Sequence, residues 1–331
     1  MNLTGAFRNF CRKNQLVKNG DKIVIGISGG KDSVALAHLL RGLSHDLGLT
    51  IILAHFNHHL RKSADADENF VRKLAGTWGL EFQAGSASGK LRQKKGSLEE
   101  NAREARIAFL IHLSNRLKAD TIALAHTQDD LAETVLMRLI RGVGLKGLTP
   151  IFPKRTIGGS VFIRPLLFSS SAQILQHLRA NKLAFRNDPT NLQTKYFRNK
   201  IRLELLPLLE KRYNKNIKNV LAHLSENLSL DYEYLSAQAE GLLPKEKSRR
   251  GARSVTLNAR KFTKEHPALQ RLALRLAIDS LQGHLRQLET VHVEELIDLI
   301  HCRSNGSIVH LPSGLSARKT AQYIKLYISK T

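Results

Sequence analysis

The sequence predicts an α/β fold, in which a doubly wound parallel sheet is followed by a smaller, mostly helical C-terminal domain. Short apolar runs of strand length alternate with segments whose apolar side chains recur at helical spacing, which is typical of a parallel sheet with helices on both faces. Clusters of polar residues directly follow several predicted strands. Because sheets of this class bind ligands beyond the carboxyl ends of their strands, the fold also predicts where the functional residues lie.

The first half of the chain supplies most of the predicted sheet. Short strands are predicted in the mainly apolar runs at residues 22–27, 51–56 and 121–125, and 80–83 could be a further short strand. Helices are predicted at residues 33–43, where apolar side chains recur at helical spacing, at the charge-rich segment 65–74 and at 129–140. A further helix with an apolar stripe opens at Ser97, where Ser97 and Glu100 match a capping box.

Beyond Gly142 the alternation of strands and helices is interrupted, because glycines and prolines indicate a long loop up to Pro153. The elements predicted next are an edge strand at 161–167, a helix at 173–181, a polar loop at 188–199 and a helix at 201–209. A long helical pattern covers 214–242, so we place a boundary near 212–216, with domains at 1–212 and 213–331. The second domain is predicted to hold helices at 268–281 and 293–300 and a final hairpin of 307–311 with 323–328.

Charge is the strongest bulk property of the chain, whose net charge is +24. Residues 1–190 carry 28 basic and 15 acidic side chains, and residues 191–331 carry 24 and 13, so both domains are basic. This predicts a polyanionic partner, such as a nucleic acid, that touches both domains. A generally basic proteome or a solubility effect is the alternative.

The cysteines and the apolar runs limit the class of protein. Cys11 and Cys302 stand far apart and form neither a metal-binding nor a disulfide pattern, which predicts a cytoplasmic protein. No run approaches the roughly 18 apolar residues of a membrane span, so no membrane partner is expected. The first 18 residues lack the apolar segment of a secretory signal.

The turn after the first strand, which we call the phosphate loop, reads Ser28-Gly29-Gly30-Lys31-Asp32-Ser33. Its glycines let the backbone turn with N–H groups inward, and the following helix adds its positive N-terminus, so the loop predicts a phosphate site. The two serines can donate hydrogen bonds and Lys31 adds charge. Asp32 would repel a phosphate unless Mg²⁺ lay between them. A tight turn with Asp32 beside the helix dipole is the alternative.

A second polar cluster follows the fourth strand. Asp130 and Glu133 are three residues apart at a helix start and share one face, and His126 ends the strand before them. Asp32 and Asp130, on adjacent strand–helix turns, could hold one Mg²⁺ from two sides. His126 could hydrogen-bond a phosphate or a substrate. A first-turn acid that only complements the dipole is the alternative for Asp130.

Histidines follow the second strand as His55, His58 and His59. We reject a zinc site, because no cysteine is near and the spacing lacks helical geometry. His58 and Arg61 are better explained as contacts to a nucleotide or RNA, and His59 as a solvated loop side chain.

Basic side chains are predicted to contact phosphate at two further places. Arg103 and Arg106 are one helical turn apart and could face ATP or RNA phosphate, with a solvated helix face as the alternative. Arg198 and Arg202, together with Lys200, lie in a loop that leads into a helix, where arginine offers a planar fork for phosphate. A basic run at 245–253 favours RNA binding as well.

Six ordered motifs between residues 22 and 209 closely resemble the tRNA(Ile)-lysidine synthetases of the PP-loop ATP pyrophosphatase superfamily. They are S-G-G-K-D-S at 28–33, A-H-F-N-H-H-L-R at 54–61, E-N-A-R-E-A-R at 100–106, A-H-T-Q-D-D-L-A-E-T at 125–134, R-P-L-L at 164–167 and D-P-T-N followed by R-N-K-I-R at 188–202. The rest of the chain matches only in length and in its basic, helical character.

The resemblance implies an ATP-dependent ligase. ATP would adenylate the C2 oxygen of cytidine 34 in the CAU anticodon of tRNA(Ile), pyrophosphate would leave, and free L-lysine would then replace AMP to give lysidine, which changes decoding from AUG to AUA. The cofactors implied are ATP and Mg²⁺. The resemblance does not fix the oligomeric state, for which a homodimer is one option.

The resemblance also implies roles for individual residues. The catalytic set is Asp32, His126, Asp130, Glu133 and Arg198, of which Asp32 and Asp130 would hold Mg²⁺. Glu133 could hold the lysine ammonium or accept its proton. The ATP-binding set is the phosphate loop, residues Ser28, Gly29, Gly30, Lys31, Asp32 and Ser33, with Ala54. The RNA or substrate contacts are His58, Arg61, Arg103, Arg106 and Arg202.

Two other functions stay open at this stage. A PP-loop tRNA thiolase would need cysteines in or near the catalytic domain, an arrangement that Cys11 and Cys302 do not supply. A non-catalytic nucleic-acid-binding protein with a decayed nucleotide site is the other option, and the intact phosphate loop with its acidic cluster argues against it.

Overall fold

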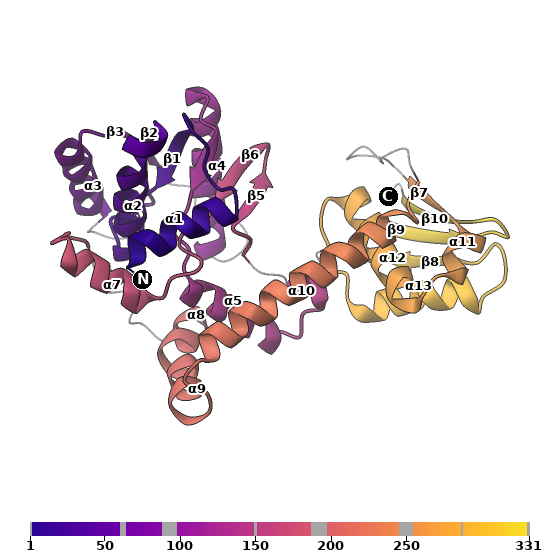
Figure 1. Cartoon of the computed structure of the whole chain (residues 1–331). Coiled ribbons are helices and arrows are strands. Elements are labelled where there is room, and N and C mark those ends of the chain that lie inside the picture. The colour runs from indigo at the N-terminus through magenta and orange to yellow at the C-terminus, as the bar shows by residue number, and fades with distance from the viewer. Residues whose placement is uncertain are drawn as a thin grey trace. The chain divides into compact units, whose positions relative to one another are not determined.

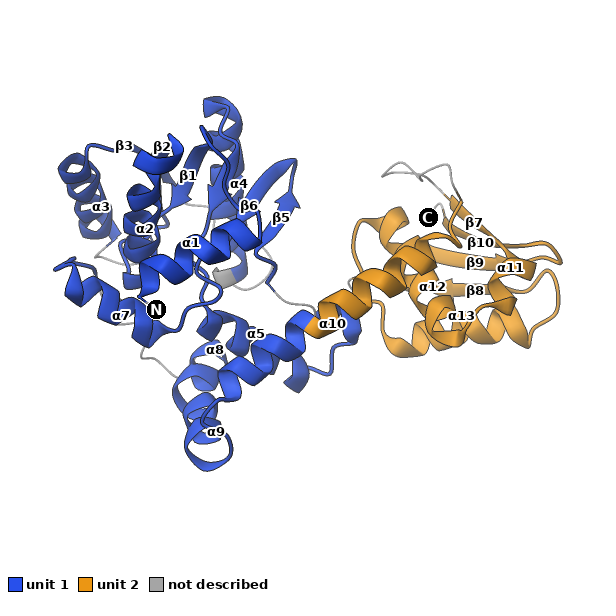
Figure 2. Cartoon of the chain, viewed as in Figure 1, with its two compact units in different colours: residues 1–226 blue, residues 227–331 orange. Residues whose placement is uncertain are grey.

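The computed structural model describes residues 2–59, 64–87, 98–148, 151–186, 197–244, 254–285 and 287–329. The chain divides into two compact units, Met1–Glu226 and Asn227–Thr331, and the division falls within helix α10 (Ile217–Glu240) (Figure 2). The domain limits expected from the sequence, 1–212 and 213–331, stay a prediction. No described helix is both long and apolar enough to cross a membrane.

Unit 1 is built on a six-stranded sheet in the order β3-β2-β1-β4-β6-β5 (Figure 1). The strands are β1 (Lys22–Gly26), β2 (Thr50–Asn57), β3 (Glu81–Ser86), β4 (Thr121–Ala123), β5 (Lys154–Ile157) and β6 (Ser160–Ile163). All pair in parallel except β5, which runs antiparallel to β6. The strand predicted at 161–167 exists as β6, but its predicted position at the edge of the sheet is wrong, because β5 lies outside it. Strand β5 falls between the predicted loop, which ended at Pro153, and the strand predicted at 161–167, in a stretch for which the sequence predicted no element.

Alternate residues of the central strands enter two cores, as a doubly wound sheet requires. Ile23 and Ile25 face a core with helices α1 (Leu3–Lys13), α2 (Lys31–Leu47), α3 (Ala64–Trp78) and α7 (Ser171–Ala180). Val24 faces the opposite core, beneath α4 (Leu98–Leu117). Helix α1 was not predicted, because its buried face is narrow: Phe7 and Cys11 are its buried residues within a basic segment.

A third, smaller core packs the last helices of unit 1 against α5, the helix that follows β4. Helix α5 (Gln128–Ile140) buries Leu131 and Val135 against Ile201 and Leu206. The elements around it are α6 (Leu145–Leu148), α8 (Phe197–Lys200), a π-helical turn (Ile201–Leu205), α9 (Leu206–Arg212) and the start of α10. This packing brings residues from the region near 200 beside α5, although some 65 positions separate them in sequence.

Unit 2 packs helices against a four-stranded antiparallel sheet in the order β7-β10-β9-β8. Its elements are β7 (Ser254–Asn258), α11 (Ala259–Lys264), α12 (Pro267–Gln282), α13 (Thr290–His301), β8 (Ile308–Leu311), β9 (Leu315–Lys319) and β10 (Tyr323–Ile328). The predicted hairpin of 307–311 with 323–328 is wrong, because β9 lies between these strands and pairs with both. Strand β9 escaped prediction since Ser316 and the basic Arg318 interrupt its apolar pattern.

Candidate active site

The phosphate loop joins β1 to α2 and has the form predicted for an anion site. Gly29 has φ +84°, and a side chain there would press against Phe70 and Val71, so the position requires glycine. Gly30 caps α2 without a side-chain hydrogen bond, which leaves first-turn N–H groups of the helix free for a ligand. Ser28 and Ser33 fix the turn, because their hydroxyl oxygens lie 3.2 Å apart and the Ser33 hydroxyl donates to Gly30 O over 2.9 Å.

Arg186 holds the phosphate loop from outside, a role that the sequence did not reveal. Its backbone N–H donates to Gly29 O over 2.9 Å, and its Nε donates to Oδ1 of the buried Asp67 over 3.1 Å. The loop is thus anchored to α3 before any ligand binds. Only proximity in the fold reveals this contact, since 157 positions separate Gly29 from Arg186.

Asp32 sits in the first turn of α2, where Lys31 Nζ donates to its Oδ1 over 2.6 Å. Burial raises the pKa of Asp32 and the Asp130 carboxylate raises it further, while Lys31 opposes both effects. The two aspartates therefore lie close enough to repel each other. Adjacent, repelling carboxylates are what a shared cation would stabilise.

Asp130 is held at the N-terminus of α5 by a reciprocal capping box with Thr127. Its Oδ2 accepts hydrogen bonds from Thr127 N and Oγ1, each 2.9 Å long, and its Oδ1 accepts one from Arg198 Nη2 over 2.8 Å. Burial alone would raise the pKa of Asp130, but Arg198, the Thr127 N–H and Arg202 hold it below the ordinary value. Asp130 is thus a fixed, ionised carboxylate.

Glu133 lies one turn further along α5 and is fully buried. Arg198 Nε donates to its Oε2 over 2.8 Å, and Arg202 donates to Oε1 and Oε2 over 2.5 and 3.0 Å. Arg198 and Arg202 are four residues apart across the start of the π-helical turn, so both reach the same face of α5. In this arrangement Glu133 orients two arginines, and it would meet an ammonium group only after one of them had moved.

Asp129, the neighbour of Asp130, has a structural role. Its Oδ2 accepts from Ser171 N over 2.6 Å and its Oδ1 lies 2.8 Å from Lys218 Nζ. Asp129 therefore joins the starts of α5, α7 and α10, which leaves Asp130 as the acid of this pair that faces Asp32.

His126 follows β4 and is half-buried beside Asp130, with its Nδ1 atom buried. Burial lowers the pKa of His126 to about 3, aided by Arg164, Arg106 and Arg103 and opposed by Asp130. The imidazole is therefore neutral at pH 7. Its Nδ1 has no hydrogen-bond partner among the described residues, so it offers one polar atom to a ligand.

The residues predicted to contact RNA or a nucleotide differ in their exposure to solvent. Arg106 on α4 is half-buried, and its buried Nε lacks a partner within the described parts of the chain, whereas Arg103 is exposed. His58 is half-buried with its ring edge-on to Phe56, at a centroid distance of 4.9 Å. Ala54 is buried in β2, where its carbonyl accepts from Ile27 N.

The histidines after β2 are described by the structure, whereas some other predicted residues are not. His55 is structural, because its Nδ1 lies 2.9 Å from Ile27 O inside the fold. His59 is exposed, as expected of a loop side chain. Arg61, Ser97 of the predicted capping box, the motif at 188–191 and the basic run at 245–253 lie outside the described residues.

The side chains at this edge of the sheet could supply two carboxylate ligands to Mg²⁺. Asp32 and Asp130 supply carboxylate oxygens, and the described residues contain no cluster of three or more histidine, cysteine, aspartate or glutamate side chains that could hold a metal. Mg²⁺ is commonly held by one or two carboxylates together with substrate phosphates and water. Two acids beside a phosphate loop match that pattern better than an all-protein metal site.

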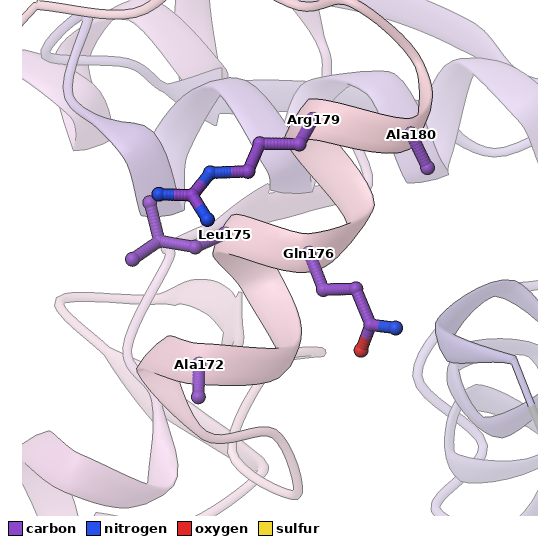
Figure 3. A pocket seen from close by; sticks show the side chains of 5 residues that line it. All are labelled: Ala172, Leu175, Gln176, Arg179 and Ala180. Atoms are coloured by element: carbon purple, nitrogen blue, oxygen red, sulfur yellow. The ribbon is translucent and has the colours of Figure 1, made fainter.

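A hollow on the solvent-facing side of α7 contains none of the predicted site residues (Figure 3). It is lined by one helix alone, through Ala172, Leu175, Gln176, Arg179 and Ala180. The site is instead the edge where β1 and β4 end side by side, with the phosphate loop on one strand and the acid–arginine cluster on the other.

Comparison with known proteins agrees with this geometry. Residues 3–209 match the family model of a PP-loop domain, and residues 257–323 match that of a TilS substrate binding domain. A tRNA(Ile)-lysidine synthase from Clostridium tetani is 36% identical over 93% of this chain and 66% of its own length, and one from Dehalococcoides mccartyi is 34% identical over 94% and 67%. The chain thus spans about two thirds of the length of these relatives.

A solved structure supports the fold. The U34-tRNA thiolase NcsA from Methanococcus maripaludis, with its [4Fe-4S] cluster, matches 68% of this chain and 79% of its own with a TM-score of 0.59. At 22% identity this likeness concerns the fold alone. The two family models and the lysidine synthase relatives go further: the chain belongs to the tRNA(Ile)-lysidine synthase family of PP-loop proteins.

Proposed function

We propose that the chain ligates free L-lysine to C2 of cytidine 34 in the CAU anticodon of tRNA(Ile), using ATP and releasing AMP and pyrophosphate. The observation that carries this proposal is that β1 and β4 are adjacent parallel strands, so that the phosphate loop after β1 lies beside Asp130 and Glu133 on α5, which follows β4. Arg198 bonds both of these acids. Relatives that are named tRNA(Ile)-lysidine synthases and match more than nine tenths of the chain support it.

The first step would activate the cytidine. Its C2 oxygen attacks the α-phosphorus of ATP and forms a phosphorus–oxygen bond with it. The bond from the α-phosphorus to the bridging oxygen of the β-phosphate breaks, and pyrophosphate leaves. The free N–H groups at the start of α2 and the hydroxyls of Ser28 and Ser33 would hold phosphate oxygens, which places positive potential where negative charge develops. The cytidine must leave its stack to reach this edge, at a cost of a few kcal/mol.

In the second step the neutral amine of lysine would attack C2, and AMP would leave with the former carbonyl oxygen. A carboxylate near the attacking nitrogen would hold or accept its proton. Asp130 and Glu133 are the described acids of the cluster on α5, and Arg198 bridges them. Movement of Arg198 toward a phosphate would open one carboxylate to the amine, which assigns this arginine a catalytic role.

We further propose that Asp32 and Asp130 hold the Mg²⁺ that accompanies ATP. When bound there, the ion would offset the charge of the leaving pyrophosphate. The two aspartates would otherwise repel both each other and the phosphates. His126, neutral at pH 7, would donate or accept a hydrogen bond at the base or a phosphate without adding charge.

Unit 2 is proposed to bind the tRNA, and the open face of its sheet suits RNA. Lys325 and Arg318 are exposed cross-strand neighbours on β10 and β9, with Tyr323 exposed on the same side of β10. The alternate residues Ile324 and Leu326 are buried against the helices, so the basic and aromatic side chains remain for a partner. Lysine and arginine contact phosphates, and tyrosine stacks on unpaired bases.

The rival thiolase function is less well supported. Burial raises the pKa of the Cys11 thiol to about 12, so this cysteine does not supply a thiolate for sulfur transfer. The other cysteine, Cys302, lies in unit 2. A lysidine reaction needs neither, and it is expected in the cytoplasm, where its tRNA is used.

The proposal is tested by incubating the protein with ATP, Mg²⁺, radiolabelled lysine and bulk bacterial tRNA lacking lysidine. We expect label in tRNA, with one AMP and one pyrophosphate formed for each lysine bound. Release of AMP without label in tRNA would reject lysine as the substrate, and no tRNA-dependent release would reject the ligase altogether.

A further inference from the structure

Two consecutive acids in the first turn of α5 have different partners. Asp130 lies near Asp32, whose pKa its carboxylate raises. Asp129 instead accepts a hydrogen bond from Ser171 N over 2.6 Å and lies 2.8 Å from Lys218 Nζ. Neighbouring residues of a helix point about 100° apart, and they move together when the turn that carries them moves. The contacts of Asp129 therefore bear on where Asp130 lies.

The capping box of α5 cannot by itself place Asp130 beside Asp32. It joins the Asp130 carboxylate to Thr127 within the same turn, so it fixes the side chain to its own helix. The sheet reaches this turn through a short connection from the end of β4, which is held where Leu124 N donates to Ile163 O over 2.9 Å. The position of the turn therefore also depends on the contacts of α5 with other helices.

The ion pair of Asp129 with Lys218 is one such contact, and it joins α5 to the first turn of α10. Its side chains are only 15% and 28% exposed, so solvent screens the pair less than an ion pair on the surface. Burial opposes the charge on Lys218, but hydrogen bonds and the charges of Asp129 and Glu210 raise its pKa above the ordinary value. Lys218 is therefore a charged partner of Asp129.

Gln128 makes a parallel set of contacts one residue earlier. Its side-chain Nε2 donates to Asn219 Oδ1, and its backbone N–H donates to Ser169 O over 3.0 Å. Further along the same helices, Leu131 and Leu221 belong to one apolar core, and Figure 1 shows α5 beside the start of α10. Two consecutive residues of α5 thus bind two consecutive residues of α10, as well as the segment that leads into α7.

We propose that Asp129 and Lys218 are positioning residues, which hold the first turn of α5 so that Asp130 faces Asp32 and the phosphate loop. Their contacts are with the starts of α7 and α10 and with α9, so their effect on the reaction passes through Asp130. The inference rests on the proposed function in so far as that function makes Asp130 catalytic. A displacement of about 1 Å at a reacting centre can cost about 100-fold in rate.

The alternative is that the pair only stabilises the packing of α5 on α10. The second partner of Lys218 separates the two explanations. Glu210 Oε1 lies 3.1 Å from the same Lys218 Nζ, but Glu210 belongs to α9 rather than to α5. Loss of the Glu210 carboxylate removes one charge from the same lysine and leaves the contact between Lys218 and Asp129 in place.

The test compares Asp129→Asn, Lys218→Met, their double variant and Lys218→Arg, with Glu210→Gln as the matched control. Asp129→Asn keeps an oxygen for Ser171 N and removes the charge opposite Lys218. Lys218→Met keeps the length of the stem without the ammonium, and Lys218→Arg keeps the charge. Turnover is measured as tRNA-dependent release of pyrophosphate, at a temperature where urea denaturation shows that every variant is folded. The same assay gives the KM for tRNA.

For a positioning role, kcat should fall about 10- to 100-fold in Asp129→Asn and in Lys218→Met, while the KM for tRNA stays near that of the wild type. The double variant should lose no more than the worse single variant, because the two residues act as a unit. Lys218→Arg and Glu210→Gln should retain most of the turnover.

Three results would overturn the positioning role. They are an unchanged kcat in the folded variants of Asp129 and Lys218, a loss in Glu210→Gln or Lys218→Arg as large as in Lys218→Met, and a change confined to the KM for tRNA. Lysine incorporation by the wild-type chain is measured in parallel. A wild type that releases pyrophosphate without incorporating lysine would refute the proposed function and leave the comparison among the variants valid.

Discussion

Asp32→Asn is expected to separate catalysis from stability. The substitution removes one negative charge from the phosphate loop and keeps the shape of the side chain. In the native fold, burial and the nearby Asp130 both disfavour ionised Asp32, as its raised pKa indicates. A group whose pKa is raised on folding destabilises the fold once the pH exceeds its unfolded value of 3.8, so at pH 7 the neutral amide removes a cost.

The opposing contribution is the ion pair with Lys31. Its side chains are 29% and 31% exposed, and a pair of this kind contributes about 0–1 kcal/mol. We therefore expect the free energy of unfolding to change by no more than about 1 kcal/mol in either direction. Turnover should fall roughly 100- to 1000-fold, the usual loss when a group that stabilises transition-state charge is removed.

Urea denaturation measures the stability and AMP release measures the turnover. Asp46→Asn is the matched control, because Asp46 is an exposed aspartate paired with Arg8, and the charge change is the same. Near-normal turnover of Asp32→Asn would refute its role at the phosphates. A loss of stability above about 3 kcal/mol would refute the electrostatic reasoning instead.

Three other predictions concern the cluster, the pH dependence and unit 2. Glu133→Gln should destabilise the fold by about 3–5 kcal/mol, because it leaves Arg198 and Arg202 facing an amide; a change under about 1 kcal/mol in urea denaturation would contradict this. Burial lowers the pKa of both His38 and His177, whose ring nitrogens lie 3.1 Å apart, so stability should be full above pH 6.5 and fall as the pH drops below that value. His177→Gln should reduce this loss of stability, measured as the free energy of unfolding between about pH 5 and 7, a range around the ordinary histidine pKa of about 6.5. An unchanged pH dependence of the free energy of unfolding would show that the histidine pair does not cause the loss. Lys325→Gln with Arg318→Gln should lower tRNA affinity but not the turnover of bound tRNA, and equal affinity in filter binding would remove the sheet of unit 2 from the interface.

The sequence predicted the parts of the site that depend on local chemistry. The phosphate loop is a turn whose glycines and helix N-terminus are visible in six consecutive residues, and its form in the structure matches the prediction. Asp130 could be placed for the same reason, since it follows a buried strand and opens a helix. The parallel sheet then brings the two turns together, because β1 and β4 pair directly.

Contacts between distant segments could not be predicted in this way. The sequence suggested that Arg198 and Arg202 face phosphate, whereas the structure pairs both with Glu133 through a π-helical turn that has no sequence signal. Arg186 appeared as an ordinary basic residue and Arg164 only as the first residue of a motif without an assigned role, and the fold alone places them beside Gly29 and at the end of β6. Spacing within a helix is local, whereas the convergence of strands, loops and helices is a property of the tertiary fold.

The central claim is that lysine is joined to a cytidine in the anticodon. Cytidine carries an unprotonated N3 and an exocyclic amine that feed electron density to O2, whereas uridine has a protonated N3 and a second carbonyl. A buried acceptor for the amine would also be left unpaired by uridine, at a cost of about 1–3 kcal/mol.

The most direct measurement compares two transcripts of tRNA(Ile) that differ only in cytidine or uridine at position 34. Each is incubated with the protein, saturating ATP and radiolabelled lysine, and the modified nucleoside is identified by mass spectrometry after digestion. We expect lysidine from the cytidine transcript and no lysine adduct from the uridine transcript. Equal labelling of the two transcripts, or no labelling of either, would contradict the account.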